Sequence, residues 1–170
     1  LSGTLIRLGF AAVPGEFLPW KTTPDSALAS AWRVTEALLA RLRDEVQRDG
    51  ARLIVFHVPP RPAVYDDDWR RTRRAYAFDA RAWSPRRDAM DLGGICRRQR
   101  LQCVFPEAAF RREAARIAPA GGRLYFAGDA HWTAAGNALA AQLIAAALSD
   151  TATAAVAPDA RPAGRGRVAR

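Results

Sequence analysis

Asp129 and His131 are the two residues whose types and spacing are best suited to chemistry. An imidazole acts as a general base near neutral pH when a carboxylate fixes its tautomer and stabilises the imidazolium that forms. Residues i and i+2 diverge on a helix, so this pair needs a tight turn to meet. Gly128 before the pair and Thr133 after it, a typical helix N-cap, indicate such a turn. We therefore predict a base and its orienting carboxylate.

A simpler interpretation of the same pair stays open. An aspartate and a histidine in a turn before a helix can satisfy backbone amides and the positive helix N-terminus without doing chemistry. Between them and the helix stands Trp132. We predict that this indole packs beneath the turn instead of serving as a platform for substrate.

The run from Asp129 to Gly136, Asp-Ala-His-Trp-Thr-Ala-Ala-Gly, resembles the last conserved block of SGNH (GDSL-like) hydrolases. Its Asp-x-His form is similar to that of branches related to polysaccharide O-acetyltransferases. In pattern the resemblance extends over residues 26–149, and it implies a flavodoxin-like α/β fold, a three-layer sandwich with a mainly parallel sheet flanked by helices. It also implies that His131 is the general base and acid, that Asp129 orients it, and that no cofactor or metal is needed.

The nucleophile that the resemblance implies is a serine in a Gly-Asp-Ser block, assisted by a glycine and an asparagine. None of the serines stands in that context; they are Ser2, Ser26, Ser30, Ser84 and Ser149. In α/β hydrolases the serine precedes the Asp–His block. We therefore expect the nucleophile, and the N-terminal part of the domain, to lie before Leu1.

These observations predict the C-terminal portion of a serine ester hydrolase that acts on small O-acyl esters, including those on carbohydrate. One alternative is acyl transfer to a sugar hydroxyl instead of water. Another is a non-catalytic remnant or binding domain. A third is an arginine-mediated nucleic-acid binder, because the formal net charge is +9. We rank it last, since the arginine clusters at residues 70–74 and 97–100 are typical of solvated faces.

Other candidate residues are weaker. His57 follows an apolar run, where α/β sites form, but a core histidine with one hydrogen bond is the simpler interpretation. The acidic run at residues 66–68 lacks a spaced ligand set and is expected to be a solvated turn that faces arginines. Cys96 and Cys103 allow one disulfide in an exported protein, although buried free thiols are the interpretation we favour. With two histidines and no paired ligand spacing, we expect no metal.

The elements that position these residues follow from periodicity. Residues 26–48 are predicted to form an amphipathic helix that ends at Gly50 and has Asp25 or Ser26 as its N-cap. Its expected apolar face consists of Trp32, Thr35, Leu38, Leu39, Leu42 and Val46. The apolar run at residues 53–58 predicts a strand covered on both faces. Residues 61–85 show no clean period, so we expect an irregular segment that serves as a lid or substrate wall.

The second half of the chain continues the alternation of helices and strands. We predict helices near residues 86–100, burying Met90 and Ile95, at 107–117 and at 133–148, with short strands at 101–105 and 124–126. Residues 1–150 form one domain, and the Ala/Pro/Gly/Arg-rich residues 151–170 are predicted to be disordered. The chain starts without methionine, so any targeting sequence is expected to be missing, and export or a cytoplasmic location both stay open.

Overall fold

The computed structural model describes residues 2–8 and 12–150. The tail at residues 151–170, predicted to be disordered, lies outside the described residues. Two short helical segments open the chain: helix α1 (Ser2–Arg7) and the 3-10 helix η1 (Gly15–Trp20). Within the described ranges no helix combines the length and the apolar character needed to cross a membrane.

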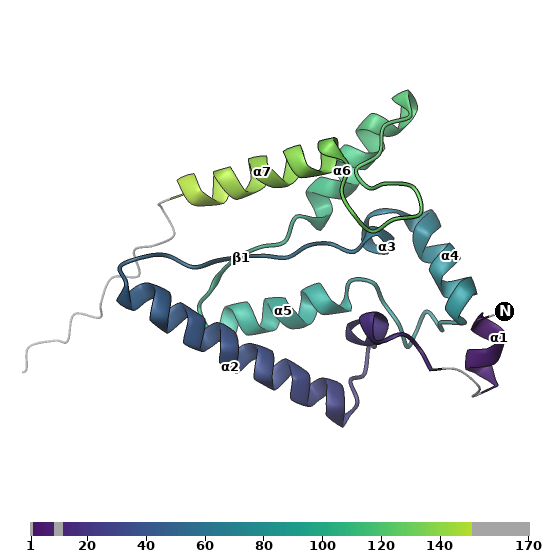
Figure 1. Ribbon diagram of the computed structural model, residues 1–170, viewed down its shortest axis with the longest axis horizontal. Helices are drawn as coiled ribbons and strands as arrows, with labels where there is room; N and C mark the ends of the chain where they lie inside the picture. The colour runs from purple at the N-terminus through teal and green to yellow at the C-terminus, as the bar shows by residue number, and fades with distance from the viewer. Residues whose placement is uncertain (1, 9–11, 151–170) are drawn as a thin grey trace, which may run out of the picture.

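A small parallel sheet lies at the centre of the molecule. Strand β1 (Ile54–Phe56) pairs with β2 (Gln102–Val104), so that Val55 lies opposite Cys103. Helices α6 (Glu107–Ile117) and α7 (Ala134–Ser149) lie on one side of the sheet, and α2 (Ser26–Arg48) and α5 (Arg87–Arg98) lie on the other (Figure 1). This layering confirms the predicted α/β fold with a parallel sheet between helices.

Helix α2 has the predicted ends and only part of the predicted burial. Of the two candidate caps it is Asp25 that accepts a hydrogen bond from the Leu28 backbone N at 2.9 Å, and Gly50 follows the helix with φ at 73°. Leu38 and Leu42 are exposed, whereas the other four residues of the expected apolar face are partly buried. Polar groups also tie the helix to the end of α5: Glu36 pairs with Arg98 at 2.6 Å, and Arg43 donates to the Gln99 carbonyl at 2.6 Å.

Most of the segment at residues 61–76 lies in two helices, so the expectation of an irregular segment was wrong for this part, while a role as lid or substrate wall stays a prediction. These helices are α3 (Arg61–Val64) and α4 (Asp66–Tyr76). They were missed because most of their residues are charged and the few buried ones do not form an apolar period in the sequence. After α4 the ring of Phe78 stacks on Trp83 with centroids 4.3 Å apart, beside Trp20 of η1. This segment is therefore part of the packed body of the domain.

The main core lies between α3, α6, α7 and the segment before α7. Phe110 and Leu124 are fully buried, Tyr125 almost so, and all three pack with Val64 and Ala140. The predicted helix at 107–117 is confirmed, and the 3-10 helix η2 (Ala118–Ala120) ends it. In α5 the expectation for Ile95 was right, but Met90 is exposed, contrary to the prediction.

Cys96 and Cys103 form a disulfide, so the free-thiol interpretation was wrong. The bridge joins the last turn of α5 to the middle of β2, with the two Cα atoms 6.3 Å apart. The turn between these elements passes through Arg100, whose φ is 51°. The covalent link thereby fixes the register between a flanking helix and the sheet.

Replacing both cysteines by alanine is expected to lower the free energy of unfolding by roughly 2 kcal/mol. The bridge reduces the conformational entropy of the unfolded chain, and the effect is modest because the two cysteines have a sequence separation of only 7. Urea denaturation of the oxidised protein and the variant measures this difference. A reductant should shift the midpoint of the wild type and leave the variant unchanged. Equal midpoints for oxidised and reduced wild type would contradict the prediction.

Candidate active site

The loop from Leu124 to Thr133 carries the candidate catalytic pair. Two backbone hydrogen bonds close it: Thr133 N donates to the Leu124 carbonyl at 2.9 Å, and Phe126 N donates to the His131 carbonyl at 3.0 Å. At the tip, Gly128 has φ at 76°, a left-handed conformation that suits glycine. The loop is therefore a short hairpin. It begins at the core residues Leu124 and Tyr125 and ends at the start of α7.

The junction between this loop and α7 is tightly specified. The Thr133 side chain caps the helix by accepting from the Gly136 backbone N at 3.3 Å, and its hydroxyl donates to the Arg123 carbonyl at 2.7 Å. A β-carbon on Gly136 would lie well inside van der Waals contact with the Leu124 carbonyl oxygen and 2.9 Å from Cβ of Trp132. Only glycine therefore lets the helix start against the loop.

Asp129 and His131 are brought together by this loop. The Nδ1 of His131 is hydrogen-bonded to Oδ1 of Asp129, and the same oxygen accepts from the His131 backbone N at 2.8 Å. The side chains are 85% and 49% exposed, for His131 and Asp129 respectively. Because Nδ1 is engaged by the carboxylate, Nε2 is the ring nitrogen that faces outward for a proton transfer.

The hydrogen bonds to Asp129 also favour the charged form of its carboxyl group. The backbone N–H of His131, and then its ring, hold the pKa of Asp129 below the ordinary value of 3.8. The carboxylate is therefore ionised throughout the neutral range. An ionised carboxylate only accepts hydrogen bonds, so it holds the proton on Nδ1 and leaves the Nε2 lone pair available.

Aromatic packing supports the loop from below. Trp132 packs against Phe110 with ring centroids 5.2 Å apart and against Phe56 at 6.3 Å, as predicted for a packing residue. Tyr125 lies beside it and donates its hydroxyl to the Pro59 carbonyl at 2.5 Å. Burial raises the pKa of Tyr125 to about 12, so the phenol remains a neutral donor at physiological pH.

A second imidazole–carboxylate pair lies elsewhere. His57 follows β1, and its Nε2 is 3.3 Å from a carboxylate oxygen of Asp88 in the first turn of α5. Both side chains are largely buried, and the His57 Nδ1 has no hydrogen-bond partner. This histidine is a core residue with one hydrogen bond, as the sequence indicated, and it is not joined to the loop of Asp129 and His131.

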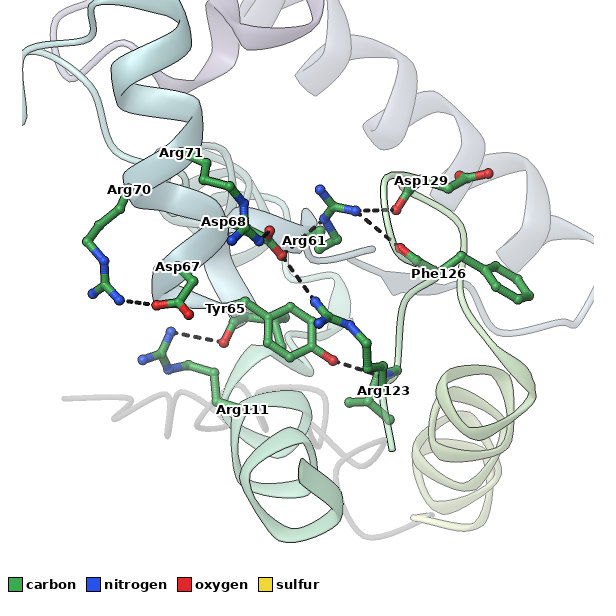
Figure 2. Close-up of polar contacts among 12 residues, drawn as sticks. Arg61, Tyr65, Asp67, Asp68, Arg70, Arg71, Arg111, Arg123, Phe126 and Asp129 are labelled. Carbon is green, nitrogen blue, oxygen red and sulfur yellow. Dashed lines mark hydrogen bonds and ion pairs between the residues drawn. The ribbon is translucent and has the colours of Figure 1, made fainter. Parts of the chain in front are cut away.

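The acidic run at residues 66–68 was misjudged in part. Asp66 and Asp67 are exposed beside arginines, but the Asp68 side chain is only 1% exposed. It faces Arg61, whose guanidinium also donates to two carbonyl oxygens of the candidate catalytic loop (Figure 2). Arg61 and Asp68 therefore belong to the surroundings of the site, and no local sequence signal distinguishes them from the many other charged residues.

No serine hydroxyl is hydrogen-bonded to His131 in the described part of the chain. Ser84 accepts from the Arg86 backbone N, and Ser149 donates to the Ala145 carbonyl. The same residues contain no group of three or more histidine, cysteine, aspartate or glutamate side chains placed to hold a metal ion.

Comparison with known proteins places this chain in a family. The family model described as "SGNH hydrolase-like domain, acetyltransferase AlgX" matches residues 17–165. Among solved structures, the O-acetyltransferase domain of Pseudomonas putida AlgJ matches with a TM-score of 0.54 and 23% identity, over 75% of this chain and 41% of that one. The chain thus spans less than half the length of this solved neighbour, and a comparison with curated proteins gives no match. From the match over residues 17–165, we conclude that the chain belongs to the family of SGNH hydrolase-like domains described by the acetyltransferase AlgX.

Proposed function

We propose that this chain supplies the base of an O-acyltransferase that works through an acyl-serine intermediate. The observation that carries the proposal is the Asp129–His131 pair, in which the carboxylate engages Nδ1 and Nε2 faces outward. In this proposal Nε2 of His131 takes the proton of an attacking serine hydroxyl. It then returns that proton to the oxygen that leaves the acyl donor.

The second half of the reaction uses the same nitrogen. An acceptor hydroxyl gives its proton to Nε2 and attacks the acyl-serine carbonyl; the serine oxygen leaves and regains the proton. If the acceptor is a sugar hydroxyl, the outcome is O-acylation, and if it is water, the outcome is ester hydrolysis. The sequence favoured hydrolysis, whereas the family description and the AlgJ domain, both acetyltransferases, support transfer. Hydrolysis is therefore kept as the second candidate.

The nucleophile is proposed to come from elsewhere in the complete protein. His131 is 85% exposed, so its outward face is open to a serine, an acyl donor and an acceptor. The AlgJ domain is longer than this chain, so a relative of this fold has room for further catalytic groups outside the matched part. The proposed substrates are a small O-acyl ester as donor and a carbohydrate hydroxyl as acceptor.

Replacing His131 by alanine in the complete protein should lower acyl transfer by about 10³-fold or more, because the members of a triad act as a unit. The measurement is transfer of an acetyl group from a chromogenic acetyl ester to an oligosaccharide, followed by mass spectrometry, with release of free acetate recorded in parallel. His57→Gln provides the matched control, since it removes an imidazole that also pairs with an aspartate. Retained transfer in His131→Ala would remove His131 from the mechanism, and wild-type protein that forms only free acetate would favour hydrolysis.

The ionisation of Asp129 gives a pH prediction. Its folded pKa lies below 3.8, so its hydrogen bonds stabilise the loop above pH 3.8, and this contribution is lost as the pH falls through the lower, folded value. The ¹³C shift of the carboxyl should therefore titrate with a midpoint below 3.8. In His131→Ala the midpoint should rise only part of the way, because the backbone N–H remains. A midpoint at the ordinary value in the wild type would show that the pair is not formed.

A further inference from the structure

The Asp129–His131 pair cannot fix its own position. Hydrogen-bonded ion pairs between exposed side chains contribute little to stability, because water competes for both partners and the side chains lose freedom. His131 and Asp129 are both largely exposed. A base must nevertheless be held within a fraction of an ångström of its productive geometry. The restraint on this pair must therefore come from groups that hold the loop backbone.

Arg61 supplies such a restraint. Its Nη1 donates to the Asp129 carbonyl at 2.9 Å and to the Phe126 carbonyl at 3.1 Å, so that a single guanidinium spans the tip of the loop (Figure 2). The carbonyl of Asp129 is attached to the same Cα as the side chain that orients His131. The backbone hydrogen bond across the tip, from Asp129 N to the Phe126 carbonyl, is longer, at 3.3 Å.

The guanidinium is itself anchored by a buried carboxylate. The Nε of Arg61 lies 3.1 Å from Oδ2 of Asp68, whose side chain is 1% exposed. Arg71 pairs with the other carboxylate oxygen, and Arg123 lies 3.9 Å from Oδ2. A carboxylate removed from water must be compensated by charge, so Asp68 holds its arginines firmly. The Oδ2 of Asp68 has no well-aligned hydrogen bond, so electrostatic attraction holds the Arg61 guanidinium next to this carboxylate.

The backbone before Arg61 is fixed as well. Arg61 is the first residue of α3 and follows two prolines, whose rings restrict φ. The buried Tyr125 donates its hydroxyl to the Pro59 carbonyl, so the segment that carries Arg61 also contacts the base of the loop. The loop is therefore attached to residues 59–61 at two points, one at its base and one at its tip.

We propose that Arg61, anchored by Asp68, is a positioning residue that acts through Asp129 to keep His131 in its reactive orientation. This inference rests on the proposed function for its catalytic consequence, but its structural part can be tested alone. Arg61 touches neither Nε2 nor any group that reacts. Its contribution lies in the geometry of the loop.

The test is Arg61→Lys in the complete protein. Lysine keeps the charge beside Asp68, but its single ammonium group cannot reproduce the planar fork that reaches both the carboxylate and the two carbonyls. Arg111→Lys is the matched control, because Arg111 also donates to two carbonyls, of Ala63 and Val64, and pairs with an aspartate, Asp66, without contacting the loop.

We expect Arg61→Lys to lower kcat for acyl transfer about 10- to 100-fold with little change in KM, as a small misplacement of a catalytic group would. Arg111→Lys should keep the wild-type kcat. Backbone amides of residues 126–131 should exchange with deuterium faster in Arg61→Lys only. The midpoint of the Asp129 carboxyl titration should rise towards 3.8 in that variant alone, because its hydrogen bonds loosen.

Two results would overturn the inference: unchanged exchange and titration of the loop in Arg61→Lys, or equal losses of kcat in the two arginine variants, which would indicate general destabilisation. Exchange and titration do not depend on turnover. If His131→Ala retains activity while these two measurements behave as expected, the proposed function fails and the positioning of the loop by Arg61 stands.

Discussion

The closure of the loop between Leu124 and Thr133 is the constraint on which the site depends. Two backbone hydrogen bonds, at 2.9 and 3.0 Å, force the chain to reverse within a few residues. Such a reversal lets side chains two positions apart meet, whereas on a helix they diverge and on a strand they share a face but stand about 6.6 Å apart. The imidazole and the carboxylate meet as a consequence of backbone geometry, and their own attraction adds little to it.

The two imidazole–carboxylate pairs differ in how far reactants could reach them. His57 and Asp88 are enclosed between β1 and α5, with the remaining ring nitrogen lacking a partner, so that no reactant has a path to it. His131 and Asp129 have the opposite environment: the carboxylate engages one nitrogen, and the other faces solvent. Burial makes the first pair more rigid, whereas access to reactants distinguishes the second.

Much of the fold and part of the site were predictable from the sequence, because those features are encoded locally. Asp25 and Thr133 are side-chain caps whose partners lie three residues away, and the helix at residues 107–117 is set by its own periodicity. The meeting of Asp129 and His131 also follows from a local turn. The role of each of these residues is visible within a short window of sequence.

The features that sequence reasoning missed depend on how separate elements pack against one another, even where the partners are close in the chain. Asp68 looks like its exposed neighbours until α3 and the segment at Arg123 cover it with guanidinium groups. Met90 continues an apolar pattern, yet its side chain remains exposed in the folded chain. The Cys96–Cys103 bridge needs both the helix and the strand in place before the sulfur atoms can meet. Each of these outcomes is decided by tertiary packing, which single-residue patterns do not contain.

Because Gly136 has no side chain, it limits which substitutions the start of α7 can accept. Helix α7 is rich in alanine, and most of its residues are not fully buried. At Gly136 the smallest substitution available would press a methyl group into the Leu124 carbonyl and the Trp132 side chain. The helix can therefore begin against the loop only if residue 136 is glycine. This position tolerates less change of side chain than the exposed alanine positions that follow it.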